Sequence, residues 1–375
     1  ASALPAGSFF SDVQGMAFGP EGNVYLVGNE DHGSTNVGLV VKGTPSSSGW
    51  SWSLLARTAE IPDSNTNFDH HWNGVVVSPD GRYVYVASGS RTDHGELQTQ
   101  NGRFPGLREA PLTSTLFRLP TAASSLLLAN DEAQLGDYRF AKGLRNAFDP
   151  AFAPGGGLMV GENGPDADYS EELNLIEQGA HYGFPWRFGN VDNATRQPSY
   201  DPATDHRLRP GYVGVDNNFY YNDPTFPPPP AAFVDPIVNH GPDADLYRDP
   251  ETGGIVDASA VSGTLSTFTG HRSPLGLSFD VAGRLCGDFK GQAFILSFGA
   301  GVARTAANDM FPDAGRDLLG LRLTPTPAGG FELETRQLIT GFSQPIDSLL
   351  LGGKLYVIEY GGAGHVYEIS LPVSG

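Results

Sequence analysis

The stretch NGVVVSPDGRYVYVASGS, residues 73–90, indicates the fold class. Apolar and polar residues alternate on both sides of the central Pro-Asp-Gly, as is typical of two strands joined by a tight turn. The same strand-turn-strand pattern recurs at residues 15–28, 146–164, 274–289 and 345–369. Recurrence at a regular period is the sequence signature of a repeat architecture. The pattern therefore predicts an all-β protein made of repeated units.

The spacing of these repeats predicts their number. They begin about 60 to 70 residues apart, except for one gap of about twice that length. A further unit between residues 185 and 262 would make the spacing even, and a blade of four strands with long loops has about this length. We therefore expect a six-bladed β-propeller of four-stranded antiparallel blades, forming one domain over residues 1–375.

One segment predicts a helix instead of a strand. It reads SEELNLIEQGAHYG, residues 170–183. Ser170 is suited to cap the helix N-terminus and Gly179 to end the helix. We expect a short helix here, packed beside a loop.

The composition agrees with many short strands and restricts the partners. The 375 residues include 49 Gly and 29 Pro, which favours tight turns over long helices. A net charge of -19 argues against nucleic acid or an anionic membrane as a partner. It fits a neutral or cationic small molecule, bound Ca²⁺, or simply an acidic surface that keeps an exported protein in solution. The single cysteine, Cys286, excludes an intrachain disulfide and a cysteine-based zinc site.

The sequence also bears on the location of the protein. No apolar run approaches the ~20 residues that a membrane span requires. No basic region followed by an apolar segment precedes Ala1, so we expect that a signal segment has been removed. We expect a periplasmic or secreted protein without a membrane span, as a monomer or a homodimer.

Polar residues at the ends of the repeated strands are the candidates for function, because propellers carry functional groups on loops. Residues 69–74 include His71, a candidate general base near neutral pH. A hydrogen-bonded structural histidine is an equal alternative. Residues 143–146 place Arg145 beside Asn146, a pair that suits an anionic or quinone oxygen. An arginine–carboxylate bridge that holds a loop is the alternative here.

A third polar cluster covers residues 162–166, 171–174 and 182–185. Backbone carbonyls at its Gly-Pro turn, with carboxylates close by in sequence, form the oxygen-only environment that Ca²⁺ prefers. The spacing alone does not identify a calcium site.

The string GLRNAFDPAFAPGGGLMVGENGPDADYSEELNLIEQGAHYGFPWRFG, which begins at Gly143, resembles the core of the quinoprotein glucose/sorbosone (soluble aldose sugar) dehydrogenases. In that family an Arg-Asn step, a Gly-Pro turn, a Glu-x-Asn and a Tyr-Gly-(Trp/Phe)-Pro follow in this order. The resemblance implies a six-bladed propeller that binds pyrroloquinoline quinone (PQQ) and calcium. It also implies oxidation of aldose sugars at C1 to lactones, with electrons passed to an external acceptor.

The resemblance also assigns roles by position. His71 resembles the family's general base, and Arg145 and Asn146 resemble the pair at the quinone oxygens. Near the cofactor, the matching residues are Asn163 as a neighbour of the quinone and Gly164 and Pro165 as carbonyl ligands of its calcium.

Further matches lie later in this string and in the chain that follows it. Glu172 and Tyr182 resemble a second, structural calcium site. His271 resembles a cofactor-lining residue and Lys290 the lysine that contacts the quinone carboxylates. An ordinary surface residue is the alternative at each of the last two positions.

Two departures from the family pattern leave other functions open. Residues 53–74 replace an early Gly-rich segment, and Ser343-Gln344-Pro345 stands where the family has an arginine step, for which Arg272 could substitute. One alternative is a non-catalytic calcium-containing propeller that binds carbohydrate or protein. The other is a propeller lactonase or lyase, with His71 or His181 as base.

Overall fold

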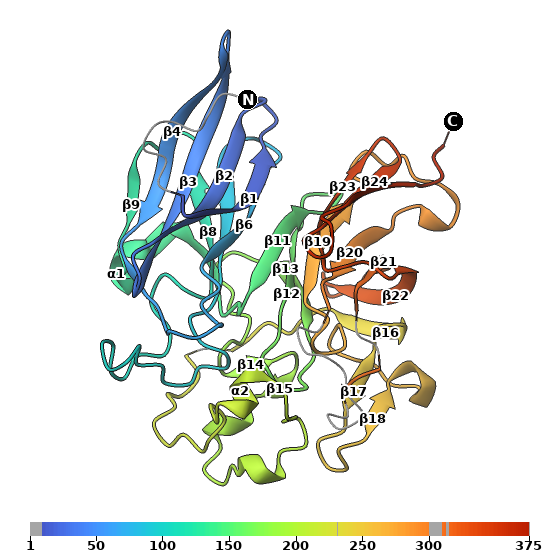
Figure 1. Cartoon of the computed structure of the whole chain (residues 1–375). Coiled ribbons are helices and arrows are strands. Elements are labelled where there is room, and N and C mark those ends of the chain that lie inside the picture. Colours follow the sequence, from blue (N-terminus) through green and yellow to red (C-terminus); the bar gives the residue numbers. More distant parts are fainter. Residues whose placement is uncertain (1–9, 231, 300–309, 313–314, 375) are drawn as a thin grey trace. The chain divides into compact units, whose positions relative to one another are not determined.

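A computed structural model describes residues 10–230, 232–299, 310–312 and 315–374 (Figure 1). Strands make up most of its regular structure and the described helices are three or four residues long, which confirms the all-β class. None of these helices is long and apolar enough to cross a membrane. The chain divides into two compact units: unit 1 comprises Ala1–Phe152 and Glu177–His181, and unit 2 comprises Ala153–Ile176 and Tyr182–Gly375.

Unit 1 contains two large sheets. The first is ordered β1 (Asp12–Phe18), β2 (Val24–Asp31), β3 (Thr35–Ser46), β4 (Gly49–Thr58) and β9 (Leu126–Leu128), with β5 (Ile61–Pro62) paired to β3. The second is ordered β10 (Arg139–Lys142), β8 (Thr115–Pro120), β7 (Tyr83–Ser88) and β6 (Trp72–Val77). The remaining elements are α1 (Glu132–Leu135), the 3-10 helix η1 (Gly136–Tyr138) and β11 (Ala147–Phe152). The second sheet has the four antiparallel strands expected of a blade, whereas β9 runs parallel to β4 in the first.

The stretch that predicted the fold forms the hairpin β6–β7. The turn follows from its residues, since Gly81 adopts the left-handed conformation (φ 70°) that glycine tolerates. The Asp80 carboxylate accepts hydrogen bonds from the Ser78 hydroxyl and the Arg82 amide, and the Ser78 amide closes the hairpin onto the Tyr83 carbonyl. The strand-turn-strand prediction is confirmed here.

The core of unit 1 packs around Trp72, which is fully buried and lies 5.6 Å from the ring of Phe117. Gly38 on β3 lets this indole approach the backbone, because a Cβ added at Gly38 would lie 2.4 Å from Trp72 Cδ2.

We expect Gly38→Ala to lower the free energy of unfolding by about 1–3 kcal/mol, since overpacking forces rigid neighbours to move. Gly330→Ala is the matched control, because its added Cβ meets only Thr326 Oγ1 at 3.7 Å. Urea denaturation followed by circular dichroism measures both, and equal midpoints for Gly38→Ala and the wild type would contradict the close packing.

Unit 2 contains sheets of different sizes. The largest is ordered β16 (Val238–Pro242), β22 (Phe331–Thr340), β21 (Asp317–Pro325), β20 (Ala293–Ser297) and β19 (Pro274–Phe279). The others pair β12 (Leu158–Glu162) with β13 (Glu172–Ile176), β14 (Arg187–Phe188) with β15 (Val191–Asp192), β17 (Leu246–Arg248) with β18 (Ile255–Asp257), and β23 (Pro345–Leu351) with β24 (Lys354–Glu359) and β25 (Val366–Ser370). Short helices are η2 (Ala194–Arg196), η3 (Pro202–Thr204), α2 (Val213–Asp216), η4 (Ser259–Val261) and η5 (Gly287–Phe289).

The helix predicted over residues 170–183 is wrong. Residues Glu172–Ile176 form strand β13, which pairs antiparallel with β12 along its whole length. The sequence ELNLI alternates polar and apolar residues, and pairing with β12 outweighs the local helix preference. Gly179 lies outside this strand in the left-handed conformation (φ 82°).

Two further expectations for unit 2 need correction. In the repeat at 274–289 the first strand forms as β19, but its hairpin partner is β20, because residues 280–292 form turns and η5. The described part of 185–262 forms two two-stranded sheets and β16, which pairs parallel with β22 instead of contributing to a four-stranded antiparallel blade.

Candidate functional site

The loop before β6 holds His71 against two carboxylates. His71 Nε2 lies 2.9 Å from Asp63 Oδ1, and possible ligand atoms of Asp63, Asp69 and His71 all lie within 4.8 Å of one another. The Asp69 carboxylate accepts hydrogen bonds from the amide and the hydroxyl of Ser64, which fixes it on this loop. The imidazole of His71 therefore has a fixed orientation in a strongly negative environment.

The surroundings shift the pKa values of the two neighbouring histidines, His70 and His71, in opposite directions. Burial disfavours the charged form of His71, but the hydrogen bond and charge of Asp63, with the charge of Asp69, outweigh it and raise the pKa of His71. Burial and the nearby charge of Arg145 lower the pKa of His70 to about 3. His70 Nδ1 lies 3.2 Å from the Ser90 hydroxyl, so this ring is a neutral, hydrogen-bonded structural histidine. The two carboxylates thus favour the protonated form of His71, whereas burial keeps His70 neutral.

The strand ends around β6 bring the predicted residues of unit 1 together. Asn73 Nδ2 donates to Asn146 Oδ1 at 2.7 Å, and the Ser90 amide donates to the Arg145 carbonyl at 2.6 Å. Gly89 lets His70 and Asn146 lie close to its backbone, since a Cβ there would lie 2.3 Å from His70 Cβ and 3.0 Å from Asn146 Oδ1. Arg145, Asn146 and the loop of His71 thus share one cluster in unit 1.

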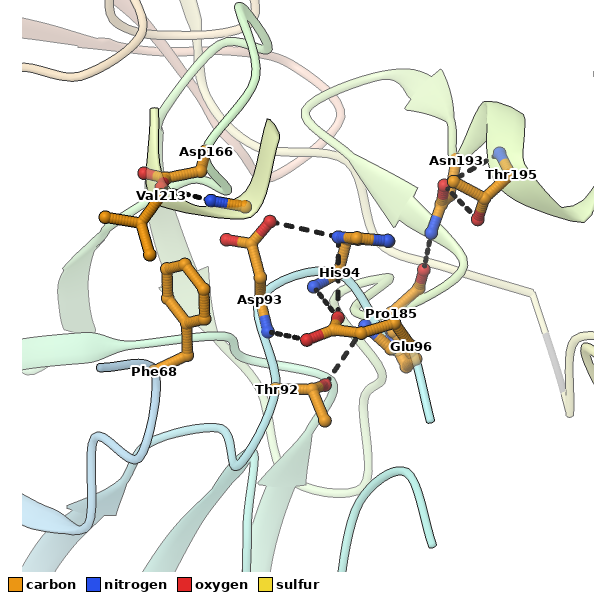
Figure 2. A network of polar contacts seen from close by, with 12 residues as sticks. Phe68, Thr92, Asp93, His94, Glu96, Asp166, Pro185, Asn193, Thr195 and Val213 are labelled. Atoms are coloured by element: carbon orange, nitrogen blue, oxygen red, sulfur yellow. Dashed lines mark hydrogen bonds and ion pairs between the residues drawn. The ribbon is translucent and has the colours of Figure 1, made fainter. Parts of the chain in front are cut away.

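Arg145 makes an ion pair that the sequence left open as an alternative. Its Nη2 lies 2.9 Å from Asp93 Oδ1 and its Nε donates to the Asp93 carbonyl at 2.7 Å. The other oxygen of Asp93 lies 2.9 Å from His94 Nδ1, and the Glu96 carboxylate accepts from the backbone amides of Asp93 and His94 (Figure 2). The guanidinium of Arg145 is therefore anchored by a buried carboxylate.

Sequence reasoning missed the charged residues that surround Arg145. Asp93, His94 and Glu96 are almost fully buried, and all three come from the segment TDHGE that follows β7. The signal was present, because this polar segment follows the end of a repeated strand in the same way as the other clusters.

Arg91 holds the loops around His71 by hydrogen bonds from its side chain to main-chain carbonyl oxygens. It is 1% exposed, and its guanidinium donates to carbonyl oxygens on three different segments. The acceptors are the carbonyls of Pro62, Asp63, Gln98, Leu107 and Arg108. Since Asp63 is among them, Arg91 positions the partner of His71.

In unit 2, the loop after β12 carries Asn163, Gly164 and Pro165. Asn163 Nδ2 donates to the Pro274 carbonyl at 3.1 Å, which ties this loop to the start of β19. Glu171 lies beside it and accepts hydrogen bonds from the amides of Gly164 and Ser273. Burial raises the pKa of Glu171 to about 7, although nearby positive charges and hydrogen bonds oppose this.

The loop before β19 places His271 and Arg272 at the same end of unit 2. His271 Nε2 lies 2.9 Å from Asp168 Oδ1 and its ring stacks on Tyr212, with the ring centroids 4.1 Å apart. Arg272 Nη2 donates to both carboxylate oxygens of Asp317, at 2.7 and 2.6 Å. Arg272, the expected substitute for the missing C-terminal arginine, is thus already paired with a buried carboxylate.

Lys290 does not join this group. In the antiparallel pair β19–β20, Pro274 lies opposite Ser297 and Phe279 opposite Ala293. His271 and Arg272 precede Pro274 at one end, whereas Lys290 precedes Ala293 at the other. At about 3.3 Å per residue the six residues of β19 separate these ends by roughly 17 Å. The structure therefore separates two residues that were both expected at the cofactor.

Oxygen ligands also gather on the β12–β13 pair. Glu162 lies opposite Glu172 in the register, and Asn174 Nδ2 donates to both carboxylates, at 3.0 and 2.8 Å. Burial raises the pKa of Glu172 to about 7. The buried Oδ1 of Asn174 has no hydrogen-bond partner among the residues that the structure describes. Two carboxylates and an unsatisfied amide oxygen fit the oxygen ligands that Ca²⁺ prefers.

Tyr182, expected beside Glu172 at this metal, is buried in the same unit. Its hydroxyl donates to the Leu175 carbonyl at 2.7 Å. Tyr182 is therefore held against β13, the strand that carries Glu172.

Comparisons with known proteins support the fold. A scan against protein-family models and a search of curated proteins both find no match. Among solved structures, a protein described as a glucose dehydrogenase from Thermus thermophilus is 16% identical, with 96% of this chain and 97% of that chain covered and a TM-score of 0.53. The soluble aldose sugar dehydrogenase of Escherichia coli, in the apo form, is 14% identical, with 95% and 81% covered and a TM-score of 0.53.

A third similar structure is the holo form of the PQQ domain of pyranose dehydrogenase from Coprinopsis cinerea. It is 12% identical, with 96% of this chain and 93% of that chain covered and a TM-score of 0.51. At such identities the likeness shows the fold alone. The chain has the fold of these sugar dehydrogenases over almost its whole length.

Proposed function

We propose that this protein is a quinoprotein oxidoreductase on a six-bladed β-propeller, which oxidises an aldose or a related sugar at C1 to the lactone. The supporting observation is the placement of His71, held by Asp63 in the cluster that includes Arg145 and Asn146, on a chain with the fold of sugar dehydrogenases. The electrons pass to an external acceptor. The activity belongs to the periplasm or the extracellular space, with the protein as a monomer or homodimer.

The proton chemistry follows from the His71–Asp63 pair. When Nε2–H donates to Asp63 Oδ1, Nδ1 is the ring nitrogen that remains to accept the proton of the sugar's anomeric hydroxyl. The carboxylate then stabilises the imidazolium that forms. The general base in this proposal is therefore His71 Nδ1.

Residues of several loops would hold PQQ and Ca²⁺. PQQ supplies the two-electron acceptor, and Ca²⁺ supplies a Lewis acid that polarises it. We assign Arg145 and Asn146 to the quinone oxygens and Asn163 to its vicinity. The carbonyl oxygens of Gly164 and Pro165 would hold the calcium. Further residues assigned to the cofactors are His271 as a lining group and Glu172, with Tyr182, at a structural calcium ion.

The raised pKa of His71 predicts the pH dependence of the reaction. The base is active only when neutral, so the rate should rise with pH through an apparent pKa above 6.5. Asp63→Asn removes the largest charge that raises this pKa, while burial continues to lower it. The acid limb of the kcat profile should therefore move to lower pH in Asp63→Asn.

Asp12→Asn is the matched control for this shift. Asp12 is exposed, and its charge raises the pKa of His71 less than the charges of Asp63 and Asp69 do, so its profile should stay close to that of the wild type. If the acid limb of Asp63→Asn is unchanged, Asp63 does not raise the pKa of the catalytic base, which contradicts the proposed pair.

The proposed reaction is tested by dye reduction with a panel of aldoses, in the presence of PQQ and Ca²⁺. Sugar-dependent reduction that requires both additions supports the proposal. Protein that binds sugar or another protein without any turnover would support the non-catalytic alternative.

A second candidate function is a metal-assisted lactonase. The observation that favours it is the close set of Asp63, Asp69 and His71, whose possible ligand atoms could hold a divalent ion. In that case His71 would bind the metal instead of accepting a proton. Lactone hydrolysis that needs a metal and no quinone would establish this alternative over the first.

A further inference from the structure

A pocket lies within unit 2, and no residue assigned to the cofactors lines it. Its volume is about 230 Å³, slightly below the range of about 300–1,000 Å³ typical of sites for drug-sized ligands, so it suits a small molecule. Five segments of unit 2 contribute its lining. The residues are Asp168, Tyr169, Ser170, Asn190, Val191, Arg207, Tyr247, Arg248, Pro250, Thr264, Leu265 and Ser266.

The charged groups of this lining are already paired. Asp168 Oδ2 accepts from Arg248 Nε at 2.8 Å. Arg207 makes two hydrogen bonds to Asp205, at 2.8 and 3.2 Å, and lies 4.5 Å above the ring of Tyr169. Because each charge has an opposite partner, an ionic ligand would find no unpaired charge to neutralise. A neutral ligand fits this lining better than an anion or a cation.

Several polar groups of the lining are not used within the protein. Among the described residues, the hydroxyls of Ser170, Tyr247 and Thr264 have no hydrogen-bond partner. Ser170 and Tyr247 are half-buried, and Thr264 is exposed at the edge of the lining. Ser266 differs, because its hydroxyl donates to Asn190 Oδ1 at 3.0 Å. A hydroxyl both donates and accepts, so these groups match a ligand that itself carries many hydroxyls.

The rest of the lining is apolar or aromatic. Tyr247 offers a ring, and Val191, Pro250 and Leu265 offer aliphatic surface. A sugar ring has a C–H face and a rim of hydroxyls, so it needs both kinds of surface. We propose that this pocket binds a neutral monosaccharide.

The pocket is also linked to the loop that carries His271. Asp168, in its lining, is the carboxylate that His271 Nε2 contacts at 2.9 Å. An occupant that contacts Asp168 would therefore reach a group that orients His271. The pocket is therefore connected to a residue assigned to the cofactor. Binding of a sugar in the pocket does not require this connection.

Calorimetric titration of the full-length protein, freed of metal and quinone, with neutral monosaccharides tests the proposal. We expect saturable binding of at least one neutral sugar. Tyr247→Phe and Thr264→Val each remove a hydroxyl that bonds nothing among the described residues, so both variants should fold normally. Each should weaken binding about 3- to 10-fold, and the double variant about 10- to 100-fold.

Tyr360→Phe is the control, since Tyr360 lies in the same unit, is 73% exposed and does not line the pocket. Its affinity should equal that of the wild type. Affinities that are unchanged in the double variant, tighter binding of a sugar phosphate than of the neutral sugar, or no sugar binding at all would each overturn the proposal. Because no quinone is present, the result stands apart from the success or failure of the proposed oxidation.

Discussion

His71→Asn is expected to reduce sugar-dependent dye reduction by about 10²- to 10⁴-fold, the range for loss of a general base. Asparagine keeps a polar side chain of similar reach but cannot accept the proton that the anomeric hydroxyl loses. The loss should appear in kcat with little change in the affinity for PQQ, since His71 acts on the sugar's proton. Steady-state kinetics at about pH 8, above the ordinary histidine pKa, with saturating PQQ and Ca²⁺ measure the effect.

His240→Asn is the matched control for this substitution. His240 lies in unit 2, its side chain is 41% exposed, and its Nε2 lies 3.9 Å from Glu332 Oε2. This variant should keep wild-type kcat. A His71→Asn enzyme within a factor of about ten of wild type would mean that another group accepts the proton.

Arg91→Lys is expected to cause the largest loss of stability. Lysine keeps the charge, but its three N–H donors lie on a single nitrogen. They cannot reach all the carbonyl oxygens on three segments that the wider guanidinium group contacts. Several buried carbonyls would lose their partners, and a buried charge would be left poorly solvated. We expect the free energy of unfolding to fall by about 3–5 kcal/mol, as when a buried ionic contact is broken.

Arg82→Lys provides the comparison for Arg91→Lys. The side chain of Arg82 is 74% exposed and bonds the exposed Asp80, so its replacement should change the free energy of unfolding by less than about 1 kcal/mol. Urea denaturation of both variants, followed by far-ultraviolet circular dichroism, measures the difference. Equal midpoints would show that the main-chain contacts of Arg91 contribute nothing to stability.

The sequence predicted the features that depend on neighbouring residues. The alternation on both sides of Pro79-Asp80-Gly81 specified the β6–β7 hairpin, because the turn residues and the apolar period act within a few positions. The sequence also marked His71, Arg145 and Asn146 as candidates, since each stands next to such a strand, and their roles stay predictions. Their grouping in unit 1 follows from the pairing of those strands.

The features that failed depend on distant partners. Residues 172–176 have a local preference for helix, and only their pairing with β12 makes them a strand. Strand β16 pairs parallel with β22, about 90 residues further along the chain, which no period of the sequence reveals. The order of residues along the chain assigned Lys290 to the cofactor beside His271. In the structure the two residues lie at opposite ends of the β19–β20 pair.

The buried charges could be predicted only in part. TDHGE follows a repeated strand, so Asp93, His94 and Glu96 could have been chosen as polar candidates. The ion pair of Asp93 with Arg145 depends on an approach between residues about 50 positions apart, which only the fold brings about. The same holds for Asp63, whose contact with His71 makes this histidine, and not His70, the candidate base.

Titration of metal-depleted protein with PQQ, in the presence and absence of Ca²⁺, tests the proposed function. We expect saturable, calcium-dependent binding at micromolar quinone, followed by dye reduction when an aldose is added. Absence of PQQ binding at micromolar quinone with Ca²⁺ present would contradict the proposed function, and would mean that the pairing of Arg272 with Asp317 and the missing C-terminal arginine have removed the cofactor site.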